Sequence, residues 1–188
     1  MEPDKLENAV SPLTAIIESV DAINLRVGRA VAWLALLMVL VQFTVVILRY
    51  VFAIGFIPMQ ESIWYLHGIL FMAGAGFTLM HDRHVRVDVY YRPASARKRA
   101  LIDLGGSLFA LVPICILTFY LSVSYVTNSW RVLEGSAEVS GLPFIYLLKT
   151  MIWVFAVLVG LQGIALAARA LRYLLGEVDE YHAGKRLL

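Results

Sequence analysis

The residues best suited to chemistry form a short polar string near the middle of the chain. His81 and His84 are three residues apart, and Asp88 follows four residues later. Histidine and carboxylate side chains at such spacings occur in zinc sites. However, Arg83 and Arg86 lie inside the string and would repel a divalent cation. We therefore expect no metal ion to bind here.

A second candidate is His67, which lies in an apolar stretch and could ligate haem iron. A haem held by two histidines needs another one at membrane depth, and the other three histidines lie outside the apolar stretches. We expect His67, Gln42 and Gln162 to hydrogen-bond to neighbouring helices instead. The sequence contains no zinc-protease, nucleophile-elbow or phosphate-loop motif. It therefore predicts no cofactor, no catalytic or substrate-binding residue and no enzyme activity.

Residues at the borders of the apolar stretches are more informative. Arg49 ends the first stretch, and Glu61 precedes the second. Both lie on the same side of the membrane, so they can pair with each other or with a partner protein. After the second stretch, polar residues alternate with valines over 84–89, and a solvated loop with basic anchors is the alternative interpretation there. The predicted subunit-interface and anchoring residues are Arg49, Glu61, Trp64, His84, Arg86 and Asp88.

The composition decides which elements must position these residues. Of the 188 residues, 60% are hydrophobic and 16% are charged, whereas an ordinary soluble domain has about 25% charged residues. A soluble domain of this size cannot bury so much apolar surface. The net charge of +2 is also too small to attract a polyanion. The sequence therefore predicts an integral membrane protein that contacts membrane lipid and binds no nucleic acid.

Four stretches contain no Asp, Glu, Lys or Arg. The third has 27 residues and the other three have 19 each, and a helix needs about 20 residues to cross the hydrocarbon core. Transmembrane strands are shorter and alternate polar with apolar residues. We therefore expect an all-α single membrane domain, with four transmembrane helices, over residues 1–188. The predicted spans are residues 30–48, 62–80, 104–130 and 150–168.

The basic residues predict the orientation of these spans. Thirteen Lys and Arg residues lie in the N-terminal segment, the loop over 81–103 and the C-terminal tail, and only three lie in the other two loops. Because short loops rich in Lys and Arg stay in the cytoplasm, we expect an N-in/C-in topology. No signal-peptidase motif follows the first span, so we expect that span to remain as an anchor.

Residues 11–28 show a weaker pattern before the first span. Apolar residues recur there every three or four positions, and Glu18, Asp21, Asn24 and Arg26 lie between them. Such a pattern is typical of an amphipathic helix that lies along the membrane surface. The alternative is that these residues extend the first span at its N-terminus.

Two further features concern packing within the bilayer. Small residues let helix backbones approach closely in lipid, so their abundance in the second and fourth spans predicts helix contacts there. Pro113 predicts a bend in the third span, because proline lacks an N–H and clashes with the preceding turn. The small residues are Gly68, Ala73, Gly74, Ala75, Gly76, Ala156, Gly160, Gly163 and Ala167.

Several of these motifs together resemble the small membrane subunit, of the DctQ type, of tripartite ATP-independent periplasmic (TRAP) transporters. The resemblance covers roughly residues 26–172 and includes the four-helix layout. Many members have two adjacent acids where this chain has Gln60 and Glu61, so the resemblance does not carry a second acidic contact over to this chain. The motifs are Leu-Arg-Tyr-Val-Phe at 48–52, Gln60-Glu61 with Trp64, and His-Val-Arg-Val-Asp-Val at 84–89.

A second group of motifs resembles the branch of this family linked to mannitol or chloroaromatic compounds, which implies 2-oxo acids as substrates. These motifs are Ser129-Trp130, Glu134, Gly141-Leu142-Pro143, Leu148-Lys149 and Leu161-Gln162-Gly163.

The resemblance implies a role that the residues alone do not give. In TRAP transporters a soluble periplasmic binding protein captures an organic acid, and a large permease subunit carries it with sodium ions across the bacterial inner membrane. The small subunit binds the large one and acts as a scaffold. The resemblance thus implies the large permease subunit and the periplasmic binding protein as partners. Two other functions stay open: a haem- or quinone-binding membrane anchor subunit, and a self-sufficient four-helix transporter.

Overall fold

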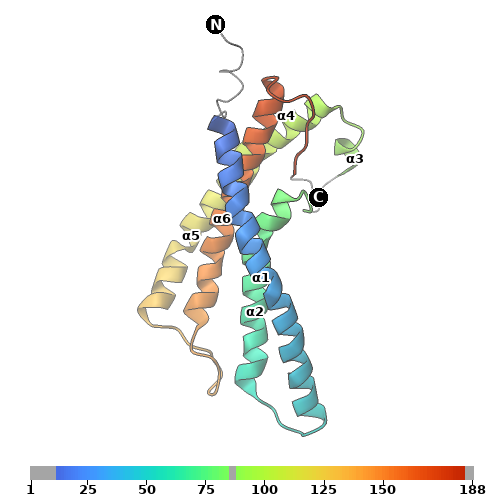
Figure 1. The fold of residues 1–188 in the computed structure, drawn as a ribbon. Helices are drawn as coiled ribbons and strands as arrows, with labels where there is room; N and C mark the ends of the chain where they lie inside the picture. The colour runs from blue at the N-terminus through green and yellow to red at the C-terminus, as the bar shows by residue number, and fades with distance from the viewer. Residues whose placement is uncertain (1–11, 85–87, 185–188) are drawn as a thin grey trace.

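The structure is a computed structural model that describes residues 12–84 and 88–184. Within these ranges the regular structure is entirely helical, which confirms the predicted all-α class (Figure 1). Four helical segments are long and apolar enough to cross a membrane, and each contains one predicted span. The elements are α1 (Pro12–Tyr50), α2 (Ile57–Met80), α3 (Asp88–Tyr91), α4 (Ala96–Gly106), the π-helical turn η2 (Ser107–Leu111), α5 (Val112–Arg131) and α6 (Ile145–Leu174).

The first helix is longer than a single span requires. Residues 12–28 are helical, but no break separates them from the predicted span over 30–48. They continue the same helix as the span and do not form a separate element. Pro12 starts the helix, a position where its missing N–H leaves no hydrogen bond unmade.

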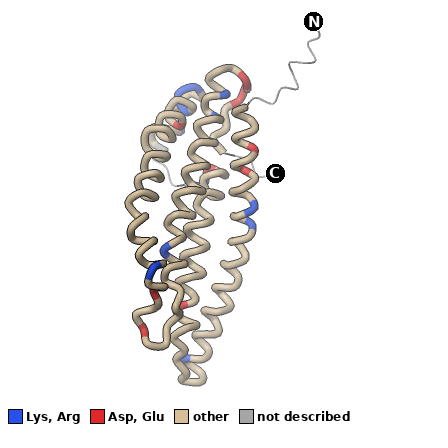
Figure 2. Tube along the Cα trace, turned by 90° about the vertical axis from the view of Figure 1, so that its left-hand side faces the viewer, with Lys and Arg blue, Asp and Glu red and all other residues tan. Residues whose placement is uncertain are grey.

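Two antiparallel helix hairpins, α1–α2 and α5–α6, make up the bundle (Figure 1). The last helix, α6, packs against α1, α2, α4 and α5 and is the centre of the assembly. Half of the most apolar window of α6 is buried, against 6% of the corresponding window of α1. Figure 2 shows that long parts of the helices carry no charged residue. The core therefore lies around α6, and much of α1 faces outward.

Small residues permit the closest helix contacts, as predicted. A Cβ added at Gly76 of α2 would collide with Asn24 of α1 and crowd the carbonyl of Leu158 in α6. On the other side of α6, Gly160 lies against Cys115, and Gly163 lies against residues of η2 and α5. Because lipid supplies no hydrophobic drive for helix association, this close packing holds the helices together.

The third span is part of a 36-residue helical segment, Ala96–Arg131. The hydrogen bonds of this segment change from the α-helical to the π-helical spacing at η2. There the N–H of Val112 donates to the carbonyl of Ser107, five residues back. The distortion ends two residues before Pro113, which lacks an N–H to continue the regular pattern. A local π-turn is a known response of a helix to such an interruption, and it places the irregularity where the sequence predicts one.

Candidate functional site

The carboxylate of Glu61 lies near the start of α2 and is 4% exposed. It accepts a hydrogen bond from the backbone N–H of Leu142 at 2.6 Å and another from the hydroxyl of Ser136. Tyr65, one turn further along α2, donates to the carbonyl of Leu142 at 3.4 Å. Gly141 leaves room for this contact, since a Cβ there would crowd Glu61 and Ser136. Glu61 therefore fixes the α5–α6 loop to α2.

Arg49 and Trp64, at the same end of the bundle, both face outward. Arg49 is exposed at the end of α1, and no ion pair joins it to Glu61 within the described residues. Trp64 is 65% exposed on α2. The possible pairing of Arg49 with Glu61 is therefore not realised, because the carboxylate is occupied by the α5–α6 loop. Arg49 and Trp64 remain available at this border.

A second contact ties the same loop to α6. Lys149 donates to Glu134 at 2.5 Å, and its ammonium group lies 4.0 Å from the centre of the Tyr125 ring. The hydrogen bond from Lys149 holds the pKa of the Glu134 carboxyl below its usual range. Both ends of the α5–α6 loop are thus anchored, one through Leu142 and the other through Glu134.

At the opposite end, two histidines bind backbone carbonyls of α2. Nδ1 of His81 lies 3.0 Å from the carbonyl oxygen of Phe77, and Nε2 of His84 lies 3.1 Å from that of Ala75. His84 therefore folds back over the end of α2. Arg86 lies outside the described residues, and the structure describes Asp88 only as the first residue of α3.

A buried polar network between α1 and α6 was predicted only in part, through the expected bond of Gln162 to a neighbouring helix. Asp21, which is 5% exposed, accepts two hydrogen bonds from Arg169, at 2.5 and 2.6 Å. Gln162 donates to Asp21 at 3.2 Å and accepts from Asn24 at 2.8 Å. Oδ1 of Asn24 is buried without a partner among the described residues. The network joins two spanning helices through charged and amide groups.

The amphipathic pattern over residues 11–28 predicts that Asp21 and Asn24 face away from the helix-bundle core, and this prediction is wrong. Asp21 and Asn24 are three residues apart and belong to the buried face of α1, together with Ile17, Val20 and Gly28. Spacings of three and four residues place side chains on one face of a helix, so these two could have been recognised as inward-facing. On α6, Gln162 and Arg169 are seven residues apart, which again means one face.

A further polar contact holds the C-terminal segment against α4. Asp103 of α4 is 8% exposed and accepts hydrogen bonds from the hydroxyls of Tyr91 and Tyr181, each at 2.5 Å. The Tyr181 ring also packs on Tyr173 at the end of α6, with 5.4 Å between ring centres. Residues 175–184 therefore lie against the cytoplasmic loop expected over 81–103. The sequence reasoning did not identify these residues.

His67, the candidate haem ligand, is exposed on α2 and stacks on Phe71 with 6.1 Å between ring centres. Among the described residues, no group of three His, Cys, Asp or Glu side chains is arranged to hold a metal ion.

The model of one protein family matches residues 38–176, well over half of the chain. That family is described as the DctQ component of tripartite ATP-independent periplasmic transporters. Comparisons with curated proteins and with solved structures gave no match. The matched range includes Glu61 and Arg169 but begins after Asp21. Together with the four spanning helices, this match shows that the chain belongs to the DctQ family of TRAP transporter small permease subunits.

Proposed function

We propose that this chain is the scaffold that holds the large permease subunit of a TRAP transporter in the bacterial inner membrane. In this proposal a periplasmic binding protein delivers an organic acid, and the large subunit carries it inward together with sodium ions. This chain contributes no substrate site. The family match supports membership of such a complex, and the packing of the helices supports the scaffold role.

The observation that carries the scaffold role is the uneven burial of the spanning helices. The buried charge of Asp21 is satisfied inside the bundle by Arg169, so it is not presented to a partner. In contrast, the outer face of α1 is open, with Trp33 72% and Phe43 64% exposed. An apolar helix face of this kind can pack on a second membrane protein as well as on lipid.

The border residues give this proposed interface its polar contacts. Arg49 and Trp64 face outward at one end of the bundle, where they can reach the large subunit directly. Glu61 acts indirectly in this proposal, because its carboxylate holds the α5–α6 loop in place. At the other end we propose contacts or lipid anchoring by His84, Arg86 and Asp88.

The distribution of Lys and Arg supports an N-in/C-in orientation, which places the Glu61 end in the periplasm, where the binding protein docks. Cysteines introduced at Gly55 and Ser95, both exposed, test this orientation. An impermeant thiol reagent added to intact cells should modify the cysteine at 55 and leave the one at 95 untouched. Labelling of the cysteine at 95 would reverse the proposed topology.

Reconstitution tests the scaffold role itself. Liposomes that contain the large subunit, this chain and the binding protein should take up the acid in a sodium-dependent manner. Liposomes that contain this chain and the binding protein, without the large subunit, should take up none. Uptake by this chain alone would show that it is a self-sufficient transporter and would overturn the proposal.

A further inference from the structure

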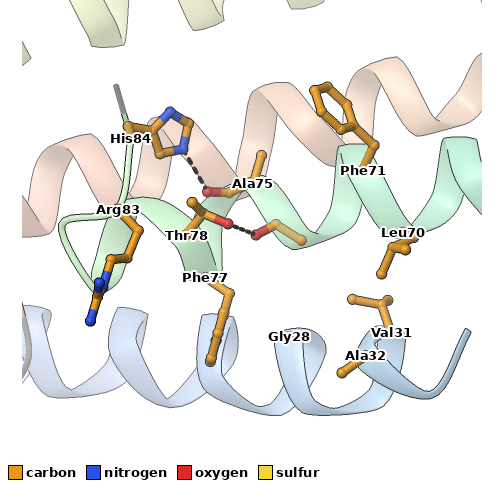
Figure 3. A pocket seen from close by; sticks show the side chains of 11 residues that line it. Gly28, Val31, Ala32, Leu70, Phe71, Ala75, Phe77, Thr78, Arg83 and His84 are labelled. Carbon is orange, nitrogen blue, oxygen red and sulfur yellow. Dashed lines mark hydrogen bonds between the residues drawn. The ribbon is translucent and has the colours of Figure 1, made fainter. Parts of the chain in front are cut away.

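A groove of about 480 Å³ lies between α1 and α2, at the end of the bundle where α2 finishes. Its walls are apolar side chains, among them Val31 of α1 and Leu70 and Phe71 of α2 (Figure 3). Phe77 packs on Gly28 and closes the space between the two helices there, because a Cβ at Gly28 would collide with the ring. The groove therefore offers an apolar ligand a surface between two membrane-spanning helices.

The polar side chains of the groove are engaged within the chain, with one exception. The hydroxyl of Thr78 donates to the carbonyl of Gly74 at 3.1 Å, and Nε2 of His84 lies 3.1 Å from the carbonyl of Ala75. Arg83 is exposed and has no ion pair with a described residue. Figure 3 shows Arg83 and His84 together at one end of the groove, with Leu70 and Phe71 towards the other.

The charge around this end is basic. Arg83 follows the last residue of α2 by three positions, so it lies at the border of the span. Arg26 and Arg29 are exposed on α1 on either side of Gly28 in sequence. Of the nearby acids, Asp82 adjoins Arg83 and is exposed, Asp21 is paired with Arg169, and Glu18 lies two turns before Arg26. Arg26, Arg29 and Arg83 still outnumber the two acids that are not paired with Arg169. Basic side chains at the headgroup layer attract anionic lipids.

We propose that this groove binds an anionic phospholipid, with one acyl chain between α1 and α2 and the phosphate at Arg83. The ligand must be apolar along its length and anionic at one end, which is the chemistry of a phospholipid such as phosphatidylglycerol. The volume falls in the range of about 300–1,000 Å³ found for small-molecule sites. A partner helix, about 10–12 Å across, would lie over such a groove instead of inside it. This inference does not depend on the proposed scaffold function.

Two substitutions separate the headgroup contact from the acyl-chain contact. Arg83→Gln removes the cation. Gly74→Leu places a side chain in the groove, and the new Cβ meets only Val31, at an ordinary 3.9 Å; Gly74→Met is a more flexible replacement if Gly74→Leu fails to fold. The matched controls are Lys98→Gln, an exposed cation away from the groove, and Gly105→Leu, where an added Cβ meets nothing within 4 Å.

The experiment titrates the purified, delipidated full chain with phosphatidylglycerol and counts bound lipid by native mass spectrometry. Arg83→Gln should weaken binding about fivefold, the scale of one basic residue at a membrane surface, and Gly74→Leu should weaken it because the new side chain takes the place of the acyl chain. The controls should bind as the unchanged chain does, and phosphatidylcholine should bind more weakly than phosphatidylglycerol. Circular dichroism and gel filtration verify that each variant is folded.

Three results would overturn the proposal. If either groove variant binds phosphatidylglycerol normally, the lipid does not occupy this groove with its phosphate at Arg83. If free glycerol 3-phosphate competes as well as the intact lipid, the site binds phosphate and not a phospholipid. If Gly74→Leu abolishes binding of the large subunit while lipid binding is unchanged, the occupant of the groove is a protein segment.

Discussion

The two ends of the bundle are held together by different kinds of contact. At the end where α1 begins and α6 finishes, the carboxylate of Asp21 pairs with Arg169, and both residues belong to spanning helices. At the opposite end, Glu61 binds Ser136 and Leu142 of the α5–α6 loop. A buried charge between helices fixes the helices relative to each other. A buried charge that binds a loop fixes that loop and leaves the helix ends free to meet a partner.

The largest expected effect comes from breaking the helix-to-helix contact. Asp21→Ala leaves the guanidinium of Arg169, whose side chain is 12% exposed, without its carboxylate. Removing one member of a buried ion pair costs about 3–5 kcal/mol. We therefore expect a marked loss of thermal stability of the detergent-purified chain, measured by its unfolding midpoint. Glu18→Ala, an exposed acid one turn earlier, should leave the midpoint unchanged.

A double substitution sharpens this test. Asp21→Leu with Arg169→Met replaces both charges by apolar side chains of similar size, a change that is often close to neutral for buried pairs. The double variant should therefore be more stable than Asp21→Ala. If it is as unstable as the single variant, the ion pair is not what joins α1 to α6, and the contrast between the two ends fails.

At the loop end, Glu61→Ala should have a local effect, confined to the loop and not spread over the bundle. It removes the acceptor for the Leu142 N–H and the Ser136 hydroxyl, and hydrogen bonds to a charged group contribute about 1.5–3 kcal/mol. Hydrogen exchange should rise in residues 132–144 and stay unchanged around Asp21. Gln60→Ala, at the neighbouring half-buried position, is the control. Increased exchange throughout the bundle would show that Glu61 holds helices and not only the loop.

The sequence was sufficient to locate the spans and was less informative about their partners. A run of about 19 residues without charge must cross the bilayer as a helix, because every backbone group needs a partner there. That argument depends only on composition, and all four predicted spans lie inside observed helices. It also places Arg49 and Glu61 at one border, but it cannot choose between the partners available to each of them.

The contacts that escaped prediction join residues far apart in the chain. Glu61 and Leu142 are 81 positions apart, and Asp21 and Arg169 are 148 apart. Helical periodicity can show which face of α1 carries Asp21, but the identity of the facing helix comes only from the tertiary fold. Its charge alone predicts a polar, outward face for Asp21. Its burial is possible because α6 brings a matching cation to the same depth.

A weaker effect, which depends on pH, is expected from the contact between Lys149 and Glu134 in the α5–α6 loop region. The pKa of Glu134 is lowered by its hydrogen bond from Lys149. A carboxyl with a lowered pKa stabilises the folded state above its unfolded pKa, near 4.5, and this contribution disappears as the pH falls through the folded pKa. The stability contributed by this pair should therefore be constant with pH near neutral and should decline in acid.

Lys149→Met provides the comparison for the pH experiment. Without the ammonium group, Glu134 should titrate closer to its ordinary pKa, and the acid-dependent part of the loss should shrink. The unfolding midpoints of the unchanged chain and of Lys149→Met are measured from neutral pH to below pH 4.5. Identical pH profiles for the two proteins would mean that the contact between Glu134 and Lys149 does not stabilise the fold in solution.

The smallest effect on stability is expected at Arg49. Substitutions there also test most directly whether the end of α1 meets a partner. Its side chain is exposed and unpaired among the described residues, so Arg49→Ala should change the unfolding free energy by no more than about 0.5 kcal/mol. The yield of co-purified large subunit should nevertheless fall.

Lys cannot reproduce a two-pronged guanidinium contact, so Arg49→Lys should also lower the yield if Arg49 binds a carboxylate of the large subunit. If Arg49 only sets the depth of α1 in the membrane, Arg49→Lys should behave as the unchanged chain. Arg131→Ala, another exposed border arginine at this end, is the matched control, and full yield with both Arg49 variants would remove Arg49 from the interface.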